Sequence, residues 1–495
     1  MWRADGRMSN QLQLLIVLNL LSPGVFPMTS EQLGAQLDAE VRGKALAAAD
    51  LAGQVLDLAS GQMLWSRRGG EARIPASNQK VVTSCAALTL LGPEHRLETS
   101  VHLRGAVHTD GTLEGDLIIK GAGDPNLSGR FFDGDITFVL RDFASRIREA
   151  GIRRVQGPVV LDAHCFDDQV VHEAWPMDQL RFWYEAPVCG LNLNDGCVDV
   201  VVEATRAGEL ARVRCEPEGW LQVATRVKTR PRGQRAQNGI GLDRADLQTV
   251  QVTGWIREGS ADYRGYITVQ DPVRFFGVML RRELEGQGVT LAGGVAVASA
   301  PVDCSGLRCL ARTVSHVSSL VQVANTSSQN LYAECLLKEL GARVEGEGSW
   351  PGGARAVGRY LQRFGEVAAP FVVDDGSGLS RRNRVTAAGM VGILQAILQT
   401  PAGEIFVGSL ARSGETGSLR KRMRGSGERG RIAAKTGHLS DVNTLSGYVL
   451  DREGEPRLAF SLLGSGFLRD GVSSPAVGQG LDALCRILLR YVDGW

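Results

Sequence analysis

A serine and a lysine three residues apart, in Ser77-Asn78-Gln79-Lys80, are the first side chains in this sequence that suggest chemistry. Residues i and i+3 share one face of a helix, so the lysine amine can reach the serine hydroxyl. A serine hydroxyl is a weak nucleophile until a base takes its proton. A neutral lysine can do so if its pKa falls from about 10.4 toward 7, which burial and nearby positive charge bring about. Taken alone, the motif also fits a helix-capping serine followed by a surface lysine.

The second motif, Ser328-Gln329-Asn330, directly precedes an apolar helical segment that starts at Leu331. Its hydroxyl and amide are groups that can contact a substrate. For an isolated serine in this place, capping of the helix is the simpler interpretation.

The third motif, Lys435-Thr436-Gly437, ends a predicted strand at residues 432–435 and is followed by a turn at residues 438–441. A lysine at a strand end can bind a substrate carboxylate, with the threonine hydroxyl as a second donor. The glycine leaves the strand backbone open to a closely approaching substrate. On its own the motif is equally typical of a surface lysine before a turn.

The order of the three motifs is far more specific than any one of them. An S-x-x-K motif, then S-x-N, then K-T-G is the signature of penicillin-binding proteins and class A β-lactamases. The local contexts also agree, because the motifs stand at a helix start, before a helix and at a strand end. The sequence therefore predicts Ser77 as an acylated nucleophile and Lys80 as its general base.

The elements that position these motifs come from both ends of the chain. Residues 53–67 predict a β-hairpin, and residues 79–91 predict a buried helix that Gly92-Pro93 stops. Ser77 then lies at a helix N-terminus, which favours developing negative charge. Further predicted helices and strands near the C-terminus are at residues 317–324, 331–340, 353–363, 387–398 and 477–489 (helices) and 432–435, 444–450 and 458–463 (strands). Together they predict one α/β domain built from residues 29–95 and 312–495.

The middle of the chain has a different sequence pattern, in which short predicted strands alternate with turns. Predicted strands are at residues 98–104, 113–120, 155–162, 198–203, 250–257 and 295–300, with helices near residues 136–150 and 272–287. The Gly/Arg-rich stretch 229–241 predicts an exposed loop. Residues 96–311 are therefore predicted to form a β-rich insertion, divided into two nested subdomains.

Beyond the three motifs, the chain resembles the low-molecular-mass class C penicillin-binding proteins, the D-alanyl-D-alanine carboxypeptidase/endopeptidase family. The resemblance runs from about Val55 to Leu463 and is strongest in PASNQK (residues 75–80), GDLIIKGAGDP (115–125) and DGSGLSR (375–381). The long separation of Ser77 from Ser328 fits a family with a large insertion there. The implied fold is an α/β, penicillin-binding/β-lactamase-like transpeptidase domain, an antiparallel sheet flanked by helices, with a large β-rich insertion.

The resemblance implies a serine D,D-peptidase that cleaves D-Ala-D-Ala, or D-amino-acid crosslinks, in peptidoglycan stem peptides. Lys435, Thr436 and Gly437 would receive the terminal carboxylate, and Asn330 would bind the stem peptide. No metal or organic cofactor is implied. β-Lactams would act as covalent inhibitors because they mimic the substrate.

The same resemblance implies the acyl-transfer roles. Lys80 would take the Ser77 proton, and Ser328 would relay a proton to the leaving amine, although which of these two residues protonates the leaving group stays open. The backbone N–H groups of Ser77 and His438 would form the oxyanion hole. His438 replaces a small polar residue that we would expect after K-T-G, and Gln329 stands where aspartate is common.

Two alternatives use the same residues differently. A β-lactamase or esterase would release the acyl group quickly, so rapid turnover of a β-lactam favours it. A non-catalytic cell-wall binding protein would not need a nucleophile, and the intact motif set argues against it.

Composition, charge and cysteine spacing argue against a nucleic-acid-binding protein and against a structural zinc site. The 495 residues are 43% hydrophobic and 22% charged with a net charge of +1, which is ordinary globular composition without a global field that attracts nucleic acid. Nine cysteines without a C-x-x-C pair argue against structural zinc. Disulfides within the groups Cys189/Cys197/Cys215 and Cys304/Cys309 stay open, whereas Cys85 and Cys335 are predicted to be buried thiols.

The N-terminus has the features of a secretory signal. Two arginines precede the apolar stretch at residues 12–21, and Ser22-Pro23-Gly24 breaks it. The stretch is shorter than the roughly 20 residues that span a bilayer. We therefore expect residues 1–28 to be a signal segment and the protein to be periplasmic or otherwise extracytoplasmic, with peripheral association with the membrane or cell wall left open.

Overall fold

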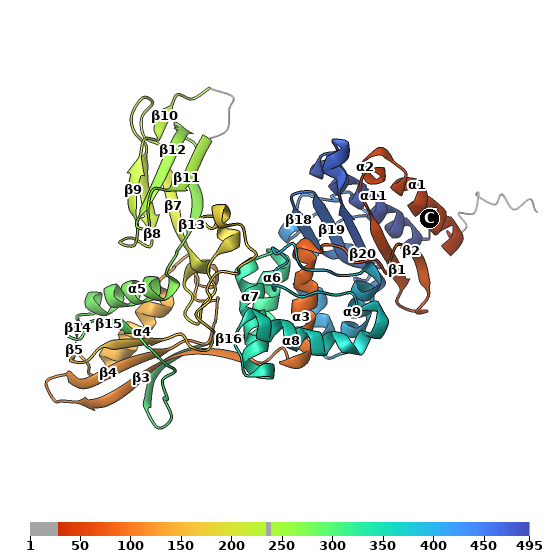
Figure 1. The fold of residues 1–495 in the computed structure, drawn as a ribbon. Coiled ribbons are helices and arrows are strands. Elements are labelled where there is room, and N and C mark those ends of the chain that lie inside the picture. Colours follow the sequence, from red (N-terminus) through yellow and green to blue (C-terminus); the bar gives the residue numbers. More distant parts are fainter. Residues whose placement is uncertain (1–27, 234–238, 495) are drawn as a thin grey trace, which may run out of the picture.

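Both ends of the chain build one six-stranded antiparallel sheet in the computed structural model, which describes residues 28–233 and 239–494. The strand order is β17-β18-β19-β20-β1-β2. These strands are β1 (Ala52–Asp57), β2 (Met63–Arg67), β17 (Ala411–Arg412), β18 (Ile432–Leu439), β19 (Val442–Leu450) and β20 (Pro456–Ser465). The N-terminal hairpin thus extends the sheet that the C-terminal strands begin, as Figure 1 shows.

Helices cover both faces of this sheet because its central strands are apolar on both sides. Along β20, Phe460 packs into the core cluster on one face and Ala459 into the cluster on the other. The first face is covered by α1 (Ser30–Val41), α2 (Lys44–Ala47) and α11 (Ser474–Val492). The opposite face is covered by α3 (Gln79–Leu90), α6 (Val317–Thr326), α7 (Asn330–Leu340), α8 (Trp350–Leu361), α9 (Ala387–Leu398) and α10 (Gly403–Ser409).

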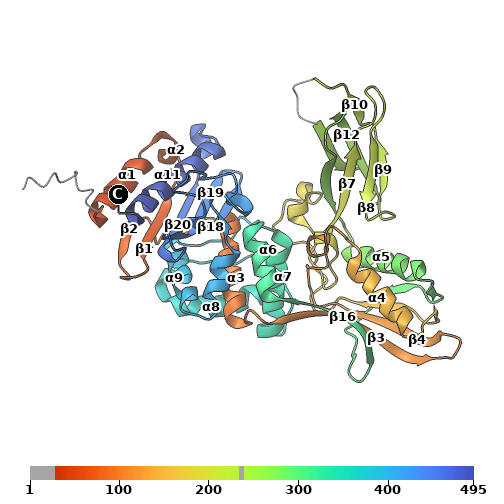
Figure 2. The same cartoon turned by 180° about the vertical axis from the view of Figure 1, so that it is seen from behind.

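The chain between α3 and α6 leaves this body and forms a mixed sheet of its own. That sheet contains β3 (Arg96–Val107), β4 (Thr112–Lys120), β5 (Arg154–Val155), β6 (Val159–Asp162), β14 (Thr290–Leu291), β15 (Val295–Val297) and β16 (Arg308–His316). Helices α4 (Phe138–Glu149) and α5 (Pro272–Gly286) pack beside each other against it (Figure 2). A separate apolar cluster stabilises this region.

A group of strands projects from the mixed sheet and forms the upper arm in Figure 1. It consists of two sheets: β7 (Cys197–Glu203), β8 (Arg212–Glu216) and β13 (Tyr263–Thr268) form the first, and β9 (Gln222–Thr225), β10 (Lys228–Arg230), β11 (Gly239–Arg244) and β12 (Thr249–Arg257) form the second. The fold is therefore α/β with a large β-rich insertion, as the sequence predicted. The domain boundaries drawn from the sequence stay a prediction.

Several local predictions need correction. The strand β18 continues through Leu439, so Lys435-Thr436-Gly437 lies inside a strand and the turn comes later. The predicted strand 155–162 is two strands, because Gly157-Pro158 interrupts it. The predicted loop 229–241 starts within β10 and ends within β11, and its residues 234–238 lie outside the described part.

The structure also tests the predictions about disulfide bonds and about membrane-spanning helices. All nine cysteines are free thiols, so neither group suggested by the sequence is a disulfide, and Cys85 and Cys335 are buried as predicted. Over residues 28–233 and 239–494, no helix is both long and apolar enough to cross a bilayer. The predicted signal segment lies outside the described residues, apart from Met28.

Candidate active site

Ser77 lies in a short 3-10 helix (Ala76–Asn78) that leads directly into α3. The preceding Ala76 has a φ of +46°, a conformation that L residues rarely adopt and that a tight packing contact must hold. Gly378 supplies that contact, since a Cβ there would lie 1.8 Å from the Ala76 carbonyl oxygen. The serine side chain is partly exposed, and it lines a cavity of about 430 Å³.

Lys80 is completely buried directly beneath Ser77. Its Nζ donates to Ser77 Oγ at 3.2 Å, to Asn330 Oδ1 at 2.7 Å and to the Ser377 carbonyl oxygen at 2.9 Å. Burial lowers the pKa of Lys80 to about 7, although the carboxylates of Glu334 and Asp375 act in the opposite direction. The i+3 contact predicted from the sequence is present, and this lysine can be neutral near pH 7.

A buried carboxylate on α7, Glu334, was not identified from the sequence. It accepts hydrogen bonds from the backbone N–H groups of Gly376 and Ser377, both at 2.8 Å. The same peptide segment presents the carbonyl oxygen of Ser377 to Lys80. Burial raises the pKa of Glu334 to about 7. The signal available for it was a single acidic residue between apolar neighbours in the first half of the stretch that became α7.

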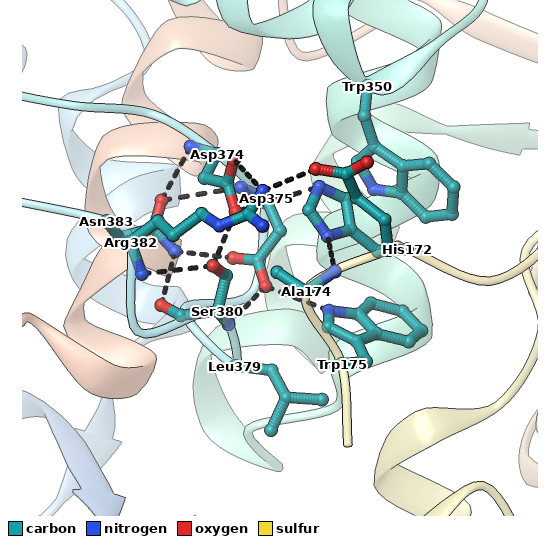
Figure 3. Close-up of polar contacts among 12 residues, drawn as sticks. His172, Ala174, Trp175, Trp350, Asp374, Asp375, Leu379, Ser380, Arg382 and Asn383 are labelled. Carbon is teal, nitrogen blue, oxygen red and sulfur yellow. Dashed lines mark hydrogen bonds and ion pairs between the residues drawn. The ribbon is translucent and has the colours of Figure 1, made fainter. Parts of the chain in front are cut away.

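Asp375 fixes the rest of this loop from inside (Figure 3). Its carboxylate accepts from Trp175 Nε1 at 3.0 Å, from the Ser380 N–H at 2.6 Å and from Asn383 Nδ2 at 2.7 Å. Satisfied buried networks of this kind hold a single geometry. The DGSGLSR segment, which the resemblance singled out, is thus a rigid support for Lys80.

The S-x-N motif occupies the other wall of the cavity. Ser328 has a φ of +58°, so the turn before α7 is strained at this residue. Asn330 is fixed at both ends of its amide, because it accepts from Lys80 and its Nδ2 donates to the Tyr184 carbonyl oxygen at 2.7 Å. Ser328 is therefore not a simple helix cap; its hydroxyl faces the third motif.

Lys435 is also completely buried, which the sequence did not suggest for a strand-end lysine. Its Nζ donates to Ser328 Oγ at 2.8 Å and to the Thr436 carbonyl oxygen at 2.9 Å. Burial and the nearby Lys80 charge hold the pKa of Lys435 well below its usual range. Two of its three N–H groups are used in these contacts. Thr436 Oγ1 lies at the cavity and donates to Ser418 Oγ at 2.7 Å.

Glycine is needed at position 437 for close packing of the protein itself, whereas the sequence suggested that it leaves room for substrate. A Cβ at this position would lie 2.1 Å from Thr444 Oγ1 and 3.1 Å from the Ser77 nitrogen. The glycine therefore lets β18 come close to the Ser77 segment itself. The next residue, His438, is exposed at the cavity edge, and its Nδ1 lies 3.2 Å from Asn443 Oδ1.

The structure thus brings all eight predicted site residues together around one cavity. Ser77, Ser328, Asn330, Thr436 and His438 line it, whereas Lys80, Lys435 and Gly437 are buried behind it. The insertion contributes Gln179, Trp183 and Tyr184, which sequence reasoning missed. The aromatic run at residues 182–184 was the signal available for them. Within the described ranges, no group of three His, Cys, Asp or Glu residues is arranged to hold a metal ion.

Nearly the whole chain is similar to known proteins. The family model described as "D-Ala-D-Ala carboxypeptidase 3 (S13) family" matches residues 33–487. A D-alanyl-D-alanine carboxypeptidase of an Actinomadura species is 33% identical, with 99% of this chain and 91% of that protein aligned. The D-alanyl-D-alanine carboxypeptidase DacB of Haemophilus influenzae is 24% identical over 81% of this chain and 82% of its own. The crystal structure of penicillin-binding protein 4 from the same organism superposes with a TM-score of 0.77 at 22% identity, covering 92% of this chain and 99% of that one.

Proposed function

The chain belongs to the D-Ala-D-Ala carboxypeptidase 3 (S13) family, and from this premise we propose that Ser77 is its nucleophile and Lys80 the general base. The protein is a serine-type D-alanyl-D-alanine carboxypeptidase that acts on peptidoglycan stem peptides and binds β-lactams. One observation carries the assignment of the residues. A buried lysine with a pKa of about 7 lies 3.2 Å from a cavity-lining serine hydroxyl.

In the acylation step, neutral Lys80 takes the Ser77 proton while Oγ forms a bond to the penultimate D-Ala carbonyl carbon. The backbone N–H groups of Ser77 and His438 stabilise the developing oxyanion. The C–N bond then breaks, and the leaving amine of the terminal D-Ala receives, through Ser328, the proton that Lys80 took from Ser77, which returns Lys80 to its neutral form. Lys435 supports this relay because its Nζ donates to Ser328 Oγ.

In the second step a water molecule attacks the acyl-Ser77 ester, and Lys80 takes the proton of that water. The stem peptide leaves with a new carboxylate, and the Ser77 hydroxyl is restored. A β-lactam reacts by the same first step, but its amine stays attached to the acyl group after the ring opens. The same cavity would accept a D-amino-acid crosslink in place of the terminal D-Ala, which makes endopeptidase activity part of the proposal.

Substrate charge is expected to be sensed by Lys435 and Thr436. A bound carboxylate favours the protonated form of Lys435 despite its lowered pKa. Amidation of the terminal carboxylate should therefore lower kcat/KM of the parent enzyme by about 10- to 100-fold, since charge-assisted contacts of this kind contribute about 1.5–3 kcal/mol. In Lys435→Ala the same amidation should change kcat/KM little, because the interaction is already absent. Steady-state kinetics with the two peptides check this.

The exposed Lys421→Ala serves as the matched control, and it should keep the full penalty for amidation. If amidation costs the parent enzyme and Lys435→Ala equally, Lys435 does not contribute to binding the carboxylate.

We expect the protein to be located outside the cytoplasm. The basis is the basic, then apolar, then Ser-Pro-Gly pattern within residues 1–28, together with a substrate found in the cell wall. Cell fractionation followed by N-terminal sequencing should find a shortened chain in the extracytoplasmic fraction. A full-length chain confined to the cytoplasmic fraction would contradict this location.

A further inference from the structure

A second cavity of about 490 Å³ lies next to the active-site cavity. Trp183 lines both cavities, and Gln329, which lines the second one, directly follows Ser328. Ser327 also lines the second cavity, and its remaining walls come from the insertion, including Arg264 and Tyr266 on β13. Its size falls within the range of about 300–1,000 Å³ typical of small-molecule sites. A substrate bound at Ser77 would therefore have a ready-made neighbouring site.

The charges in the second cavity are paired with one another. Arg130 forms an ion pair with Asp195 at 2.5 Å, and Arg264 forms one with Asp199 at 2.8 Å. Arg264 also pairs with Glu216 at 2.6 Å, so a charged ligand would have to compete with side chains that already bind these groups. A ligand hydroxyl would not, because it can donate to the carboxylate and accept from the guanidinium of an intact pair. The cavity thus favours a neutral ligand with several hydroxyl groups.

Gln329 adds a requirement for an N–H group on that ligand. Its side chain is 7% exposed, and its Nε2 donates to Asp195 Oδ2 at 3.1 Å, which fixes the orientation of the amide. Its Oε1 has no hydrogen-bond partner among residues 28–233 and 239–494. Buried polar atoms are nearly always satisfied, and Oε1 is itself covered, so a ligand N–H satisfies it once the Gln329 side chain turns toward the cavity that this residue lines.

Two aromatic side chains complete the cavity. Trp183 is 37% exposed and Tyr266 is 48% exposed, so each leaves ring surface uncovered beside the cavity. Aromatic faces of this kind pack against the C–H face of a sugar ring. Hydroxyl groups, an N–H donor and a flat C–H face occur together in N-acetylated amino sugars, the building blocks of the glycan to which stem peptides are attached.

We propose that the second cavity binds an N-acetylated amino sugar of the peptidoglycan strand whose stem peptide occupies the active site. The acetamido N–H donates to Gln329 Oε1, the ring packs on Tyr266 and Trp183, and the hydroxyls bind the two arginine–aspartate pairs. Four stem residues span at most about 14 Å when extended, which lets one substrate reach from Ser77 into the adjoining cavity. This inference rests on the proposed function of Ser77.

The test compares one stem pentapeptide with the same pentapeptide carrying its N-acetylated disaccharide. The parent enzyme should show a kcat/KM about tenfold higher for the glycan-bearing substrate, the effect of one aromatic contact with its buried area. Tyr266→Ala should abolish this preference without changing kcat/KM for the bare peptide. Tyr266→Phe should retain the preference, and Leu247→Ala, which removes an exposed apolar side chain away from the cavity, should behave like the parent.

Equal rates for the two substrates in the parent enzyme would overturn the proposal, as would a Tyr266→Ala variant that slows both substrates equally. A preference for a crosslinked peptide dimer without sugars, abolished by Tyr266→Ala, would also overturn it and assign the cavity to the neighbouring peptide. Failure of the proposed function gives a different result, because the bare peptide would then be hydrolysed normally by Ser77→Ala.

Discussion

Ser77→Ala should lose the covalent adduct that the parent protein forms with benzylpenicillin, and its D,D-carboxypeptidase activity should fall by roughly 10⁴- to 10⁶-fold. The reason is that this substitution removes the atom that forms the acyl bond while leaving the cavity walls in place. Intact-protein mass spectrometry after incubation with benzylpenicillin measures the adduct, and peptide mapping locates it.

Ser60→Ala is a suitable control, because Ser60 is an exposed serine in the β1–β2 turn. It should form the adduct like the parent. An adduct mapped to any residue other than Ser77 would contradict the assignment. The lifetime of the adduct also addresses the β-lactamase alternative, since fast release of the acyl group would support that activity and a long-lived adduct opposes it.

Removal of the Lys80 amine should lower the acylation rate by about 10²- to 10⁴-fold, the contribution typical of a positioned acid–base group. Lys80→Met is the sharper variant because it keeps an unbranched side chain in the buried site, whereas Lys80→Ala also leaves a void. Stopped-flow acylation with a chromogenic β-lactam gives the rate. Thermal unfolding of both variants shows whether the fold survives, and the exposed Lys44→Ala is the matched control.

The pH dependence of acylation provides a second test of the same role. Burial lowers the pKa of Lys80 to about 7, and only the neutral amine can accept the Ser77 proton. The acylation rate should therefore rise with pH up to about 7 and level off above it, and the rise should vanish in Lys80→Met. An unchanged rate in a folded Lys80→Met variant, or a flat profile in the parent, would show that another group is the base.

The catalytic part of the fold was predictable because its patterns are local and strong. The helix after Ser77 consists mostly of apolar and small residues with a Gly-Pro stop, and the C-terminal strands are rich in apolar residues and buried on both faces. In the insertion, strands such as β8 and β11 were missed. Both strands are short, and each has only two apolar side chains, which alternate with polar or glycine residues, so the apolar signal of each strand is weak.

In the site, too, some contacts could be predicted from the sequence, whereas others depend on the tertiary fold. The contact of Lys80 with Ser77 follows from helical spacing alone. The burial of Lys435 could not be predicted in this way. It depends on how closely β18 approaches the Ser77 segment, and the sequence around Lys435 gives no information about that tertiary contact. Trp183 and Glu334 reach the site through tertiary packing of distant segments, which a spacing argument cannot see.

The pairing of β1 with β20 has a consequence for the order in which the protein matures. A ribosome releases the hairpin and Ser77 early, but the strand that completes the catalytic sheet, and the third motif on β18, are among the last segments synthesised. A nascent or C-terminally truncated polypeptide therefore holds the serine without the lysine and threonine that face it. Hydrolytic competence is acquired only on chain completion, through long-range strand pairing that is slow to form.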